Sequence, residues 1–529
     1  MIDKRSIAGG VAALWLVSSG IALGSDSRIV SAVRDGDRAA VHSLLAQKVD
    51  VNAAETDGTT ALHWAVRSDD ADLVGRLIRA GANANATNRY GVTPLLLAAA
   101  TGDAAVVKAL IAAGADPRSA GPEGETALMV ASRTGQVDAV QVLLAHGADV
   151  NAAESWYGQT ALMWAAAENH AAVVQALIHA GAALNARSKL LGPPKRDIAD
   201  FRTDKNGLAL QTLLTTFPKQ GLTPLLFAAR QGALEAVRAL ADAGADLNLG
   251  DPDGITPMIL AIRNGHYDVA AALVEKGADI NAADAAGRTP LYVSVDMHSL
   301  DWIQNRPAPA PSGRLDSIDV ITRLLERGAN PNPQLKATPP GWKGDAVGAQ
   351  NTFGGVVAAG TTPFIRAAKN ADTAVMRVLL DHGADASITT RGRVTPLMAL
   401  VGGLGRKYGA DLHVSPEEEK NAMAAIALLL DRGADVNAAN DAGQTSLHAA
   451  AMLGANGIVR FLVDRGARVD ARNGQGRTPR DEALRGLANV DGALNDPHPD
   501  TAALLEGLMK TRGLSIAPAA TSAAVESAP

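Results

Sequence analysis

Residue types that commonly bind metals or catalyse reactions are present in this sequence but form no recognisable set. The 529 residues include no cysteine, which excludes disulfides, thiolate metal sites and a cysteine nucleophile. The 11 histidines do not cluster at the spacing of metal ligands. The segment Gly402 to Lys407 lacks the pattern of a phosphate-binding loop, and Asp251 to Gly254 lacks the later ligands of a calcium loop. The sequence therefore predicts no catalytic residues, no metal and no cofactor.

The overall composition limits both the partners and the architecture. The 49 basic and 55 acidic residues give a formal charge of −6, which supplies no bulk attraction to nucleic acid or anionic membranes. Only 3% of the residues are aromatic although 47% are hydrophobic, so alanine and leucine must build the core. A chain of this length exceeds one compact core, which leaves several domains or a repeat array.

Two markers recur with a base period of 33 residues and indicate a repeat array. The first marker is a threonine in one recurring context, found at Thr60, Thr93, Thr126, Thr160, Thr223, Thr256, Thr289, Thr362, Thr395, Thr445 and Thr478. The second marker is a Gly-Ala pair, which begins at Gly81, Gly114, Gly147, Gly181, Gly244, Gly277, Gly328, Gly383, Gly433 and Gly466.

One unit of the array shows why the period exists. Thr93 can cap a helix whose first residue is Pro94, Gly102 ends that helix, and a second helix runs to Gly114. The residues expected to face the core are Leu95, Leu97 and Ala98 in the first helix, and Val106, Val107, Leu110 and Ile111 in the second. Neither helix buries its apolar face alone, so neighbouring units must stack on each other.

These recurring residues resemble the ankyrin repeat over nearly all of 27–513. The helix start Thr60-Ala61-Leu62-His63 and the turn Gly147-Ala148-Asp149-Val150-Asn151-Ala152 are similar to the pattern of that family. The resemblance implies an all-α repeat solenoid in which each repeat contributes two helices and a finger loop. It also implies a structural hydrogen-bonding role for His63 and His448.

The composition of the two ends and the extent of the repeats predict how the chain is divided. We expect a signal peptide over 1–24, a solenoid over 25–513 and a disordered tail over 514–529. The solenoid would have a polar first cap over 29–53, ten central repeats and a divergent last repeat, in which Arg480-Asp481-Glu482 replaces apolar residues.

Departures from the period predict four insertions. Those at about 187–219 and 333–358 lengthen finger loops, whereas those at about 298–315 and 405–420 lengthen connections between paired helices. Long insertions within a compact fold tend to carry function. The alternative is that they are surface loops without a function, because lengthening a loop costs little free energy.

Nine aromatic residues occupy loops or insertions: Tyr90, Trp156, Tyr157, Phe201, Phe217, Trp302, Trp342, Phe353 and Tyr408. Exposed aromatic side chains are favoured interface anchors. We therefore expect a partner to contact Tyr90, Trp156, Tyr157, Trp302, Trp342 and Phe353, unless these residues fold back over the solenoid. By contrast, Trp64, Trp164 and Phe227 occupy a position that is usually leucine, and we assign them to the core between repeats.

Five basic residues share one register in the repeats: Arg67, Arg133, Arg230, Arg263 and Lys369. They would form a stripe on the inner face, where an acidic protein surface or a polyanion could bind through charge-assisted hydrogen bonds. The alternative is a structural role, because arginine is common at this position in the resembled family and can support neighbouring fingers.

The N-terminal segment favours export. Lys4 and Arg5 precede an apolar run from Ile7 to Leu23, and small residues end the run at Gly24. This pattern is typical of a secretory signal peptide that is cleaved after Gly24, and an uncleaved membrane anchor is the alternative.

Together these observations favour a non-catalytic scaffold that binds another protein in the periplasm or outside a bacterial cell, and the chain resembles exported bacterial ankyrin proteins. Neither nucleic acid nor, after cleavage, a membrane is an expected partner. Two alternatives stay open. One is an enzyme whose site is built by the insertions, with Asp197, Asp200, Lys205 and His298 as its titratable groups. The other is an envelope structural protein held at the membrane by its N-terminus.

Overall fold

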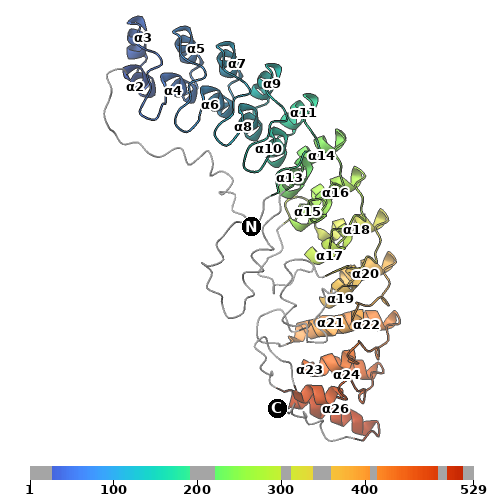
Figure 1. Ribbon diagram of the computed structural model, residues 1–529. Coiled ribbons are helices and arrows are strands. Elements are labelled where there is room, and N and C mark those ends of the chain that lie inside the picture. Colours follow the sequence, from blue (N-terminus) through green and yellow to red (C-terminus); the bar gives the residue numbers. More distant parts are fainter. Residues whose placement is uncertain are drawn as a thin grey trace, which may run out of the picture. The chain divides into compact units, whose positions relative to one another are not determined.

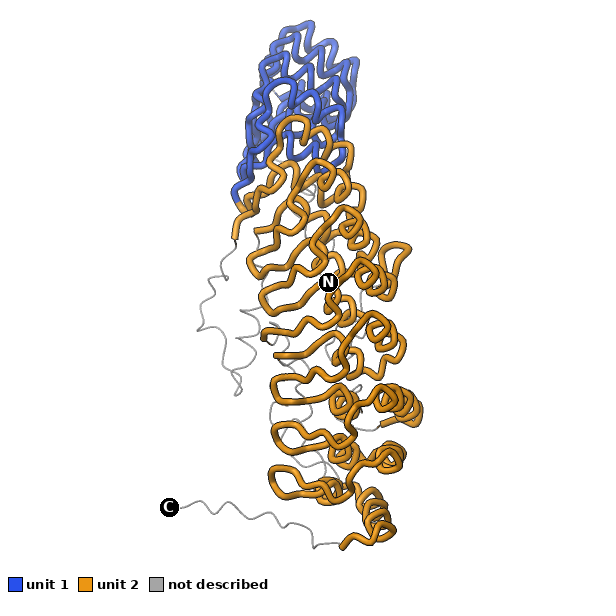
Figure 2. Tube along the Cα trace, turned by 90° about the vertical axis from the view of Figure 1, so that its right-hand side faces the viewer, with its two compact units in different colours: residues 1–155 blue, residues 156–529 orange. Residues whose placement is uncertain are grey.

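The computed structural model describes residues 27–190, 221–298, 311–337, 359–404, 414–485 and 497–515. Over these residues the chain forms 24 α-helices and no strand apart from isolated bridges. Two compact units divide the chain, unit 1 (residues 1–155) and unit 2 (residues 156–529), and Figure 2 colours them separately. The expected signal peptide and most of the expected tail lie outside the described residues.

Unit 1 consists of helix pairs stacked in chain order. Its helices are α2 (Arg28–Arg34), α3 (Arg38–Ala46), α4 (Ala61–Arg67), α5 (Ala71–Arg79), α6 (Pro94–Thr101), α7 (Ala104–Ala112), α8 (Ala127–Thr134) and α9 (Val137–Ala145). The first helix of each pair packs against the first helix of the next pair, and α5, α7 and α9 form a second layer in the same way (Figure 1).

Unit 2 repeats this two-layer arrangement over a longer stretch of chain (Figure 1). Its first helices are α10 (Ala161–Ala167), α13 (Pro224–Gln231), α15 (Pro257–Arg263), α17 (Pro290–His298), α19 (Pro363–Lys369), α21 (Pro396–Gly403), α23 (Ser446–Met452) and α25 (Pro479–Arg485). Its second helices are α11 (Ala171–His179), α14 (Leu234–Asp242), α16 (Tyr267–Glu275), α18 (Ser317–Glu326), α20 (Thr373–Asp381), α22 (Pro416–Asp431), α24 (Asn456–Asp464) and α26 (Pro499–Thr511). None of the described helices has the length and apolar character needed to span a bilayer.

The helix ends follow the expected capping pattern. The Thr93 hydroxyl accepts a hydrogen bond from the Leu96 amide at 3.2 Å, and Pro94 is the first residue of α6. Gly102 ends α6 with a φ of 85°, a left-handed conformation that glycine adopts without the steric cost of a Cβ atom. The predicted boundaries of this repeat are therefore confirmed.

The core assignment of this repeat needs correction at two positions, because Leu96 is buried in place of Leu97 and Ile111 is only partly buried. Each first helix is covered on three sides by its own second helix and by the first helices before and after it. In several repeats the position four residues after the capping threonine, which Leu97 occupies, is only partly covered. Phe227 is buried as expected, Trp164 is partly buried and packs against the core cluster that contains Phe227, and Trp64 is only partly buried.

Asparagine side chains link the turns of successive repeats. Asn52 accepts a hydrogen bond from the Asn83 amide at 2.7 Å and donates one to the Gly81 carbonyl at 3.0 Å. The same link spans insertions, since the Asn281 side chain accepts from the Asn330 amide at 2.8 Å. This ladder of turn contacts therefore keeps the repeats in register where the chain between them is long.

The fourth predicted insertion is shorter than expected. Residues 416–420 belong to α22, which spans Pro416–Asp431. The Ser415 hydroxyl accepts from the Glu418 amide at 3.1 Å, and Pro416 suits the first helical position. Glutamates in the first turn also favour this helix start through the helix dipole.

Candidate functional site

The first insertion leaves and rejoins the repeat through a closed base in unit 2. The Ser188 amide donates to the Leu222 carbonyl at 3.0 Å, and the Ser188 hydroxyl accepts from the Gly221 and Leu222 amides at 3.1 and 3.0 Å. Arg187 donates to the carbonyls of Gly221 at 2.7 Å and Gly250 at 2.8 Å. Both ends of the insertion are therefore tied to the finger loops of the repeats that follow.

The second finger insertion has a similar base. The Leu335 amide donates to the Thr361 carbonyl at 3.0 Å, and the Gly360 amide donates to the Leu335 carbonyl at 2.7 Å. Leu335 is buried and packs against Tyr292 of α17. Both finger insertions thus begin and end at fixed points, which is the condition for presenting residues to a partner with little loss of conformational entropy.

The insertion between α17 and α18 ends on histidine contacts. The Ser312 hydroxyl contacts His266 Nδ1 at 2.7 Å, while His266 Nε2 contacts the Arg230 carbonyl at 3.0 Å. His298, at the end of α17, contacts the Ser317 hydroxyl through Nδ1 at 2.8 Å and Asp372 Oδ2 through Nε2 at 3.1 Å. The hydrogen bond and charge of Asp372 raise the pKa of His298 above its ordinary value.

Exposed aromatic and apolar side chains gather at finger loops. Trp156 is 62% exposed, and Tyr157 and Tyr90 are also exposed. The loop of Tyr157 contacts the next finger, because the Lys189 amide donates to the Tyr157 carbonyl at 2.6 Å. Leu190 in that next finger is 66% exposed, and the sequence reasoning missed it because it considered only aromatic residues. Trp302, Trp342 and Phe353 lie outside the described residues.

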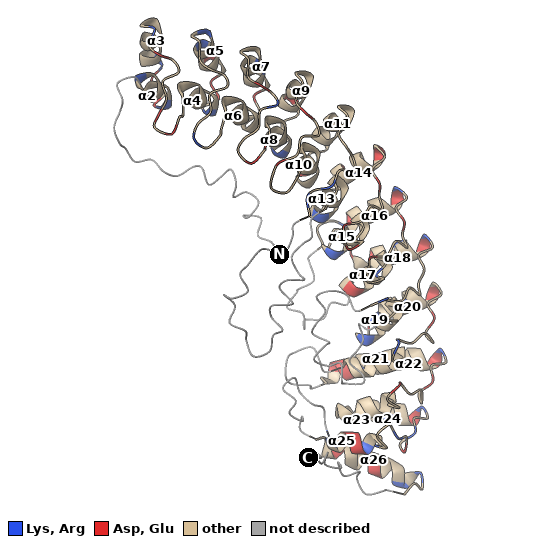
Figure 3. Cartoon of the chain, in the orientation of Figure 1, with Lys and Arg blue, Asp and Glu red and all other residues tan. Residues whose placement is uncertain are grey.

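The expected basic stripe exists as a register position in each unit, which we call the basic row. It contains Arg67 and Arg133 in unit 1, and Arg230, Arg263 and Lys369 in unit 2. In Figure 3 basic residues colour the last turns of α13, α15 and α19, and an acidic residue lies on α17. That acidic residue, Asp296, was not considered in the sequence reasoning.

Members of the basic row differ in what they contact. The Arg67 guanidinium lies 4.8 Å from the Trp64 ring centroid, and the Arg230 guanidinium lies 4.9 Å from that of Phe227. Arg133 acts on a finger-loop carboxylate: burial raises the pKa of Glu125, and the charge of Arg133 opposes that rise. Burial likewise raises the pKa of Asp251, and the charge of Arg263 opposes that rise. Part of the basic row therefore has the structural role that was the alternative to partner binding.

The negative charge of Asp296 does not neutralise the basic row in unit 2, because Asp296 pairs with another residue. Arg366 Nε donates to Asp296 Oδ1 at 2.6 Å, and the Arg366 side chain is only 1% exposed. The two opposite charges therefore neutralise each other in a buried pair. Arg263 on α15 and Lys369 on α19 hold the same register on the layers before and after this pair.

The titratable residues of the described chain form structural contacts. His63 Nδ1 contacts Thr60 Oγ1 at 2.8 Å and its Nε2 contacts the Val92 carbonyl at 3.1 Å, and His448 repeats this arrangement. The structural role expected for these histidines is therefore confirmed. Within the described residues no group of three His, Asp or Glu side chains could hold a metal ion. Asp197, Asp200 and Lys205 lie outside them.

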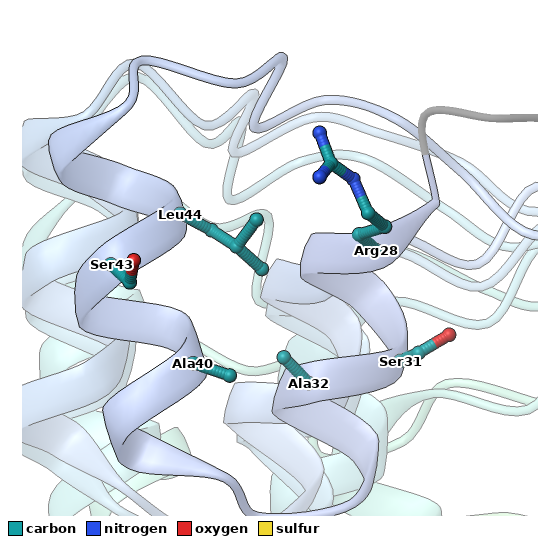
Figure 4. A pocket seen from close by; sticks show the side chains of 6 residues that line it. All are labelled: Arg28, Ser31, Ala32, Ala40, Ser43 and Leu44. Carbon is teal, nitrogen blue, oxygen red and sulfur yellow. The ribbon is translucent and has the colours of Figure 1, made fainter.

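One hollow is found on the first helix pair. It is lined by Arg28, Ser31 and Ala32 of α2 and by Ala40, Ser43 and Leu44 of α3 (Figure 4). The hollow is open and lined mainly by small side chains, and it holds neither an aromatic residue nor a carboxylate. It therefore contributes nothing to the chemistry of the basic row or the exposed fingers.

Comparison with known protein families identifies the repeats. A family model described as ankyrin repeats (3 copies) matches residues 29–120, 95–188, 204–284 and 225–304. A second model, ankyrin repeats (many copies), matches residues 429–483. Together the matched segments cover more than half of the 529 residues. A comparison with curated proteins found no match.

Proposed function

Because the chain belongs to the ankyrin-repeat family, whose repeats are generally protein–protein interaction modules, we propose that it is a non-catalytic scaffold that binds one protein partner. The binding surface consists of the finger loops and the first-helix faces of unit 2. The insertions extend this surface.

The observation that carries this proposal is the exposure of Trp156 on a finger loop attached to rigid stacked helices. A large exposed aromatic side chain is costly unless a partner covers it, and tryptophan is among the most frequent interface anchors. Tyr157 in the same loop and Leu190 in the next finger extend the apolar area. The ordered helices beneath the loops reduce the entropy lost on binding.

The insertions and the basic row define the remaining features of the partner. Trp302, Trp342 and Phe353 supply further anchor contacts in this proposal, because they are carried by segments whose ends are tied to the repeats. The basic row favours a partner with an acidic surface. Electrostatic attraction of this kind raises the association rate and makes it sensitive to salt.

The test is affinity capture followed by measurement of the captured complex. The purified chain is used to capture partners from an envelope extract, and the captured protein is identified by mass spectrometry. We expect W156A to weaken binding about 10-fold or more, and the triple variant W156A/W302A/W342A to abolish capture. Leu484→Ala is the matched control, because Leu484 is an exposed apolar residue of α25 outside the finger loops. Unchanged capture by the triple variant would contradict the anchor role.

We also propose that the chain is exported from a bacterial cell. The support is the sequence pattern of residues 1–24, with basic residues before an apolar run. N-terminal sequencing of the protein purified from the periplasm or medium tests this proposal. A start at Ser25 supports cleavage, and an intact Met1 on membrane-associated protein supports the anchored alternative.

A further inference from the structure

Buried arginines in unit 2 show how this chain compensates a desolvated cation. Four arginine side chains that are buried or nearly so each donate to a carboxylate: Arg288 to Asp284 at 2.6 Å, Arg366 to Asp296 at 2.6 Å, Arg477 to Glu482 at 2.8 Å and Arg480 to Glu506 at 2.6 Å. Such pairing is expected, because a charge removed from water is costly without an opposite charge or hydrogen bonds.

Arg230 departs from this pattern. Its side chain is partly buried over the Phe227 ring, at 4.9 Å from the ring centroid. Within the part of the chain that the structure describes, its guanidinium makes no hydrogen bond and no ion pair. Burial lowers the pKa of Arg230, and no carboxylate opposes that effect. A partly desolvated cation without a carboxylate is a feature of binding sites rather than of a packed core.

The position of Arg230 is nevertheless well defined. Its carbonyl contacts His266 Nε2 at 3.0 Å, and His266 Nδ1 contacts the Ser312 hydroxyl at 2.7 Å. Burial lowers the pKa of His266, so the neutral imidazole donates from Nε2 to this carbonyl. The guanidinium carbon of Arg230 lies over the Phe227 ring, 4.9 Å from the ring centroid. A guanidinium carries its N–H groups at the edges of its plane, the geometry that binds a carboxylate with two hydrogen bonds.

Apolar side chains of the neighbouring layers surround the cluster that contains Phe227, the ring beneath Arg230. Trp164 of α10 and Leu260 of α15 are partly buried, and both pack against the cluster that contains Phe227. Asp251, an acidic residue of the following finger, accepts hydrogen bonds from the Asp253 and Ile255 amides at 2.9 Å each. Its carboxylate is therefore engaged within its own loop.

We propose that Arg230, stacked on Phe227, binds a carboxylate of the partner, within an extended segment that carries apolar side chains on both sides of the acidic one. This inference rests on the proposed function and adds the chemistry of the segment bound. Layers of packed helices lie about 8–10 Å apart, and an extended chain advances about 3.3 Å per residue. The segment therefore has the pattern apolar-x-x-acidic-x-x-apolar, with the apolar residues on Trp164 and Leu260.

A peptide fits this surface better than a nucleic acid. A polyanion needs a continuous row of cations, whereas the basic row of unit 2 holds Arg230 and Arg263 before Asp296 interrupts it, and Trp164 and Leu260 add apolar surface nearby. The formal charge of −6 also opposes the approach of a polyanion. An acidic side chain within an apolar segment matches both the charge and the flanking contacts.

The test uses a display library of random 12-residue peptides, selected on the purified full chain and on R230Q. We expect the wild type to enrich Asp or Glu with apolar residues three positions away on each side. R230Q should lose the acidic preference and bind the selected peptide at least 10-fold more weakly. R230K should fall between the two, because lysine keeps the charge but not the paired hydrogen bonds.

Two controls separate binding from folding. Arg238→Gln makes the same change at an exposed residue of α14, where Arg238 pairs with Glu235 at 2.9 Å, and it should bind the peptide like the wild type. Thermal unfolding of R230Q should resemble that of the wild type, because the Arg230 guanidinium makes no hydrogen bond or ion pair within the described residues.

The outcomes distinguish this inference from the proposed function. Selected peptides without acidic residues, an acidic preference that persists in R230Q, or a library that yields no binder would each overturn the carboxylate site. Tighter binding of a single-stranded oligonucleotide than of the acidic peptide would also overturn it. None of these results affects capture of the partner through Trp156, which tests the proposed function separately.

Discussion

The two units end their second helices in different ways. In unit 1 the residues just before Gly81, Gly114 and Gly147 form no ion pairs between repeats among the described residues. In unit 2 the corresponding helix ends are linked between repeats by four ion pairs, Lys276 with Asp242, Arg323 with Glu275, Arg432 with Asp381 and Arg465 with Asp431. Figure 3 shows this contrast: in unit 1 the end of α5 is blue and the ends of α7 and α9 are tan, whereas in unit 2 red or blue colours the ends of α14, α16, α18, α20, α22 and α24.

The buried cores of the two units show the same contrast, with ion pairs in unit 2. Unit 1 keeps a regular period and buries mainly aliphatic side chains, with His63 as a polar contact between repeats. Unit 2 contains the predicted insertions and the buried pairs of Arg288 with Asp284 and Arg366 with Asp296. Apolar packing tolerates a shift of register, whereas an ion pair or hydrogen bond has a defined partner. The difference indicates that directional contacts preserve the register where insertions interrupt the repeat.

The largest effect is expected from breaking a buried pair of unit 2. Asp296→Ala leaves the Arg366 guanidinium buried beside a cavity, and we expect a loss of about 3–5 kcal/mol in the stability of the surrounding repeats. Hydrogen exchange of the α17 and α19 amides measures this loss locally. Asp242→Ala is the control, because its pair with Lys276 is exposed and is worth less than about 1 kcal/mol. Equal effects of the two variants would show that burial of the pair is unimportant.

An intermediate effect is expected at a contact that both units share. His63 in unit 1 and His448 in unit 2 each join a capping threonine to the carbonyl of the next repeat, with Nε2 to carbonyl distances of 3.1 Å. Replacement of either by alanine should cost about 1–3 kcal/mol, because buried polar groups lose their partners. Local exchange of the α4 and α23 amides compares the two variants. A loss found in only one unit would show that the surroundings, rather than the shared motif, determine its contribution.

Much of the repeat framework was predictable from local residues, because a cap such as Thr93-Pro94 and a terminating Gly102 act within one helix. The contacts that define the candidate site were less predictable. Arg366 and Asp296 are 70 residues apart, and the register alone does not tell which side chain turns towards the other. Likewise, Trp64 and Leu97 were assigned to the core because the pattern of apolar residues does not reveal which side of the helix lacks a covering neighbour.

A smaller effect is expected when pH is varied at the contact of α17 and α20. Asp372 raises the pKa of His298, and Asp316 adds to this effect, while Ser317 connects the imidazole to Tyr267. Burial alone would raise the pKa of Asp372, but the hydrogen bonds from His298 and the Val375 amide lower it. The His298 contribution to stability is therefore fully present below its ordinary pKa of about 6.5 and is lost as pH rises through the raised value.

This pH dependence should have the opposite sign at α4 of unit 1. Burial lowers the pKa of His63, so its contact loses stability as pH falls below the ordinary histidine value. Protection factors of the α20 and α4 amides across this range should change in opposite directions, by less than about 1 kcal/mol for the partly exposed His298. His298→Gln should remove the change at α20 and leave that at α4. A change of the same sign at both helices would contradict the assignment.

The smallest effect is expected from salt, which screens the exposed ion pairs along the helix ends of unit 2. Exposed pairs each contribute only a few tenths of a kcal/mol, so 0.5 M NaCl should lower the protection of α14, α16, α22 and α24 slightly and leave that of α7 and α9 unchanged. Chloride also affects apolar packing, but that effect applies to both units alike. The difference between the units therefore isolates the ion pairs, and a uniform response would mean that the charged helix ends contribute nothing measurable to the register of unit 2.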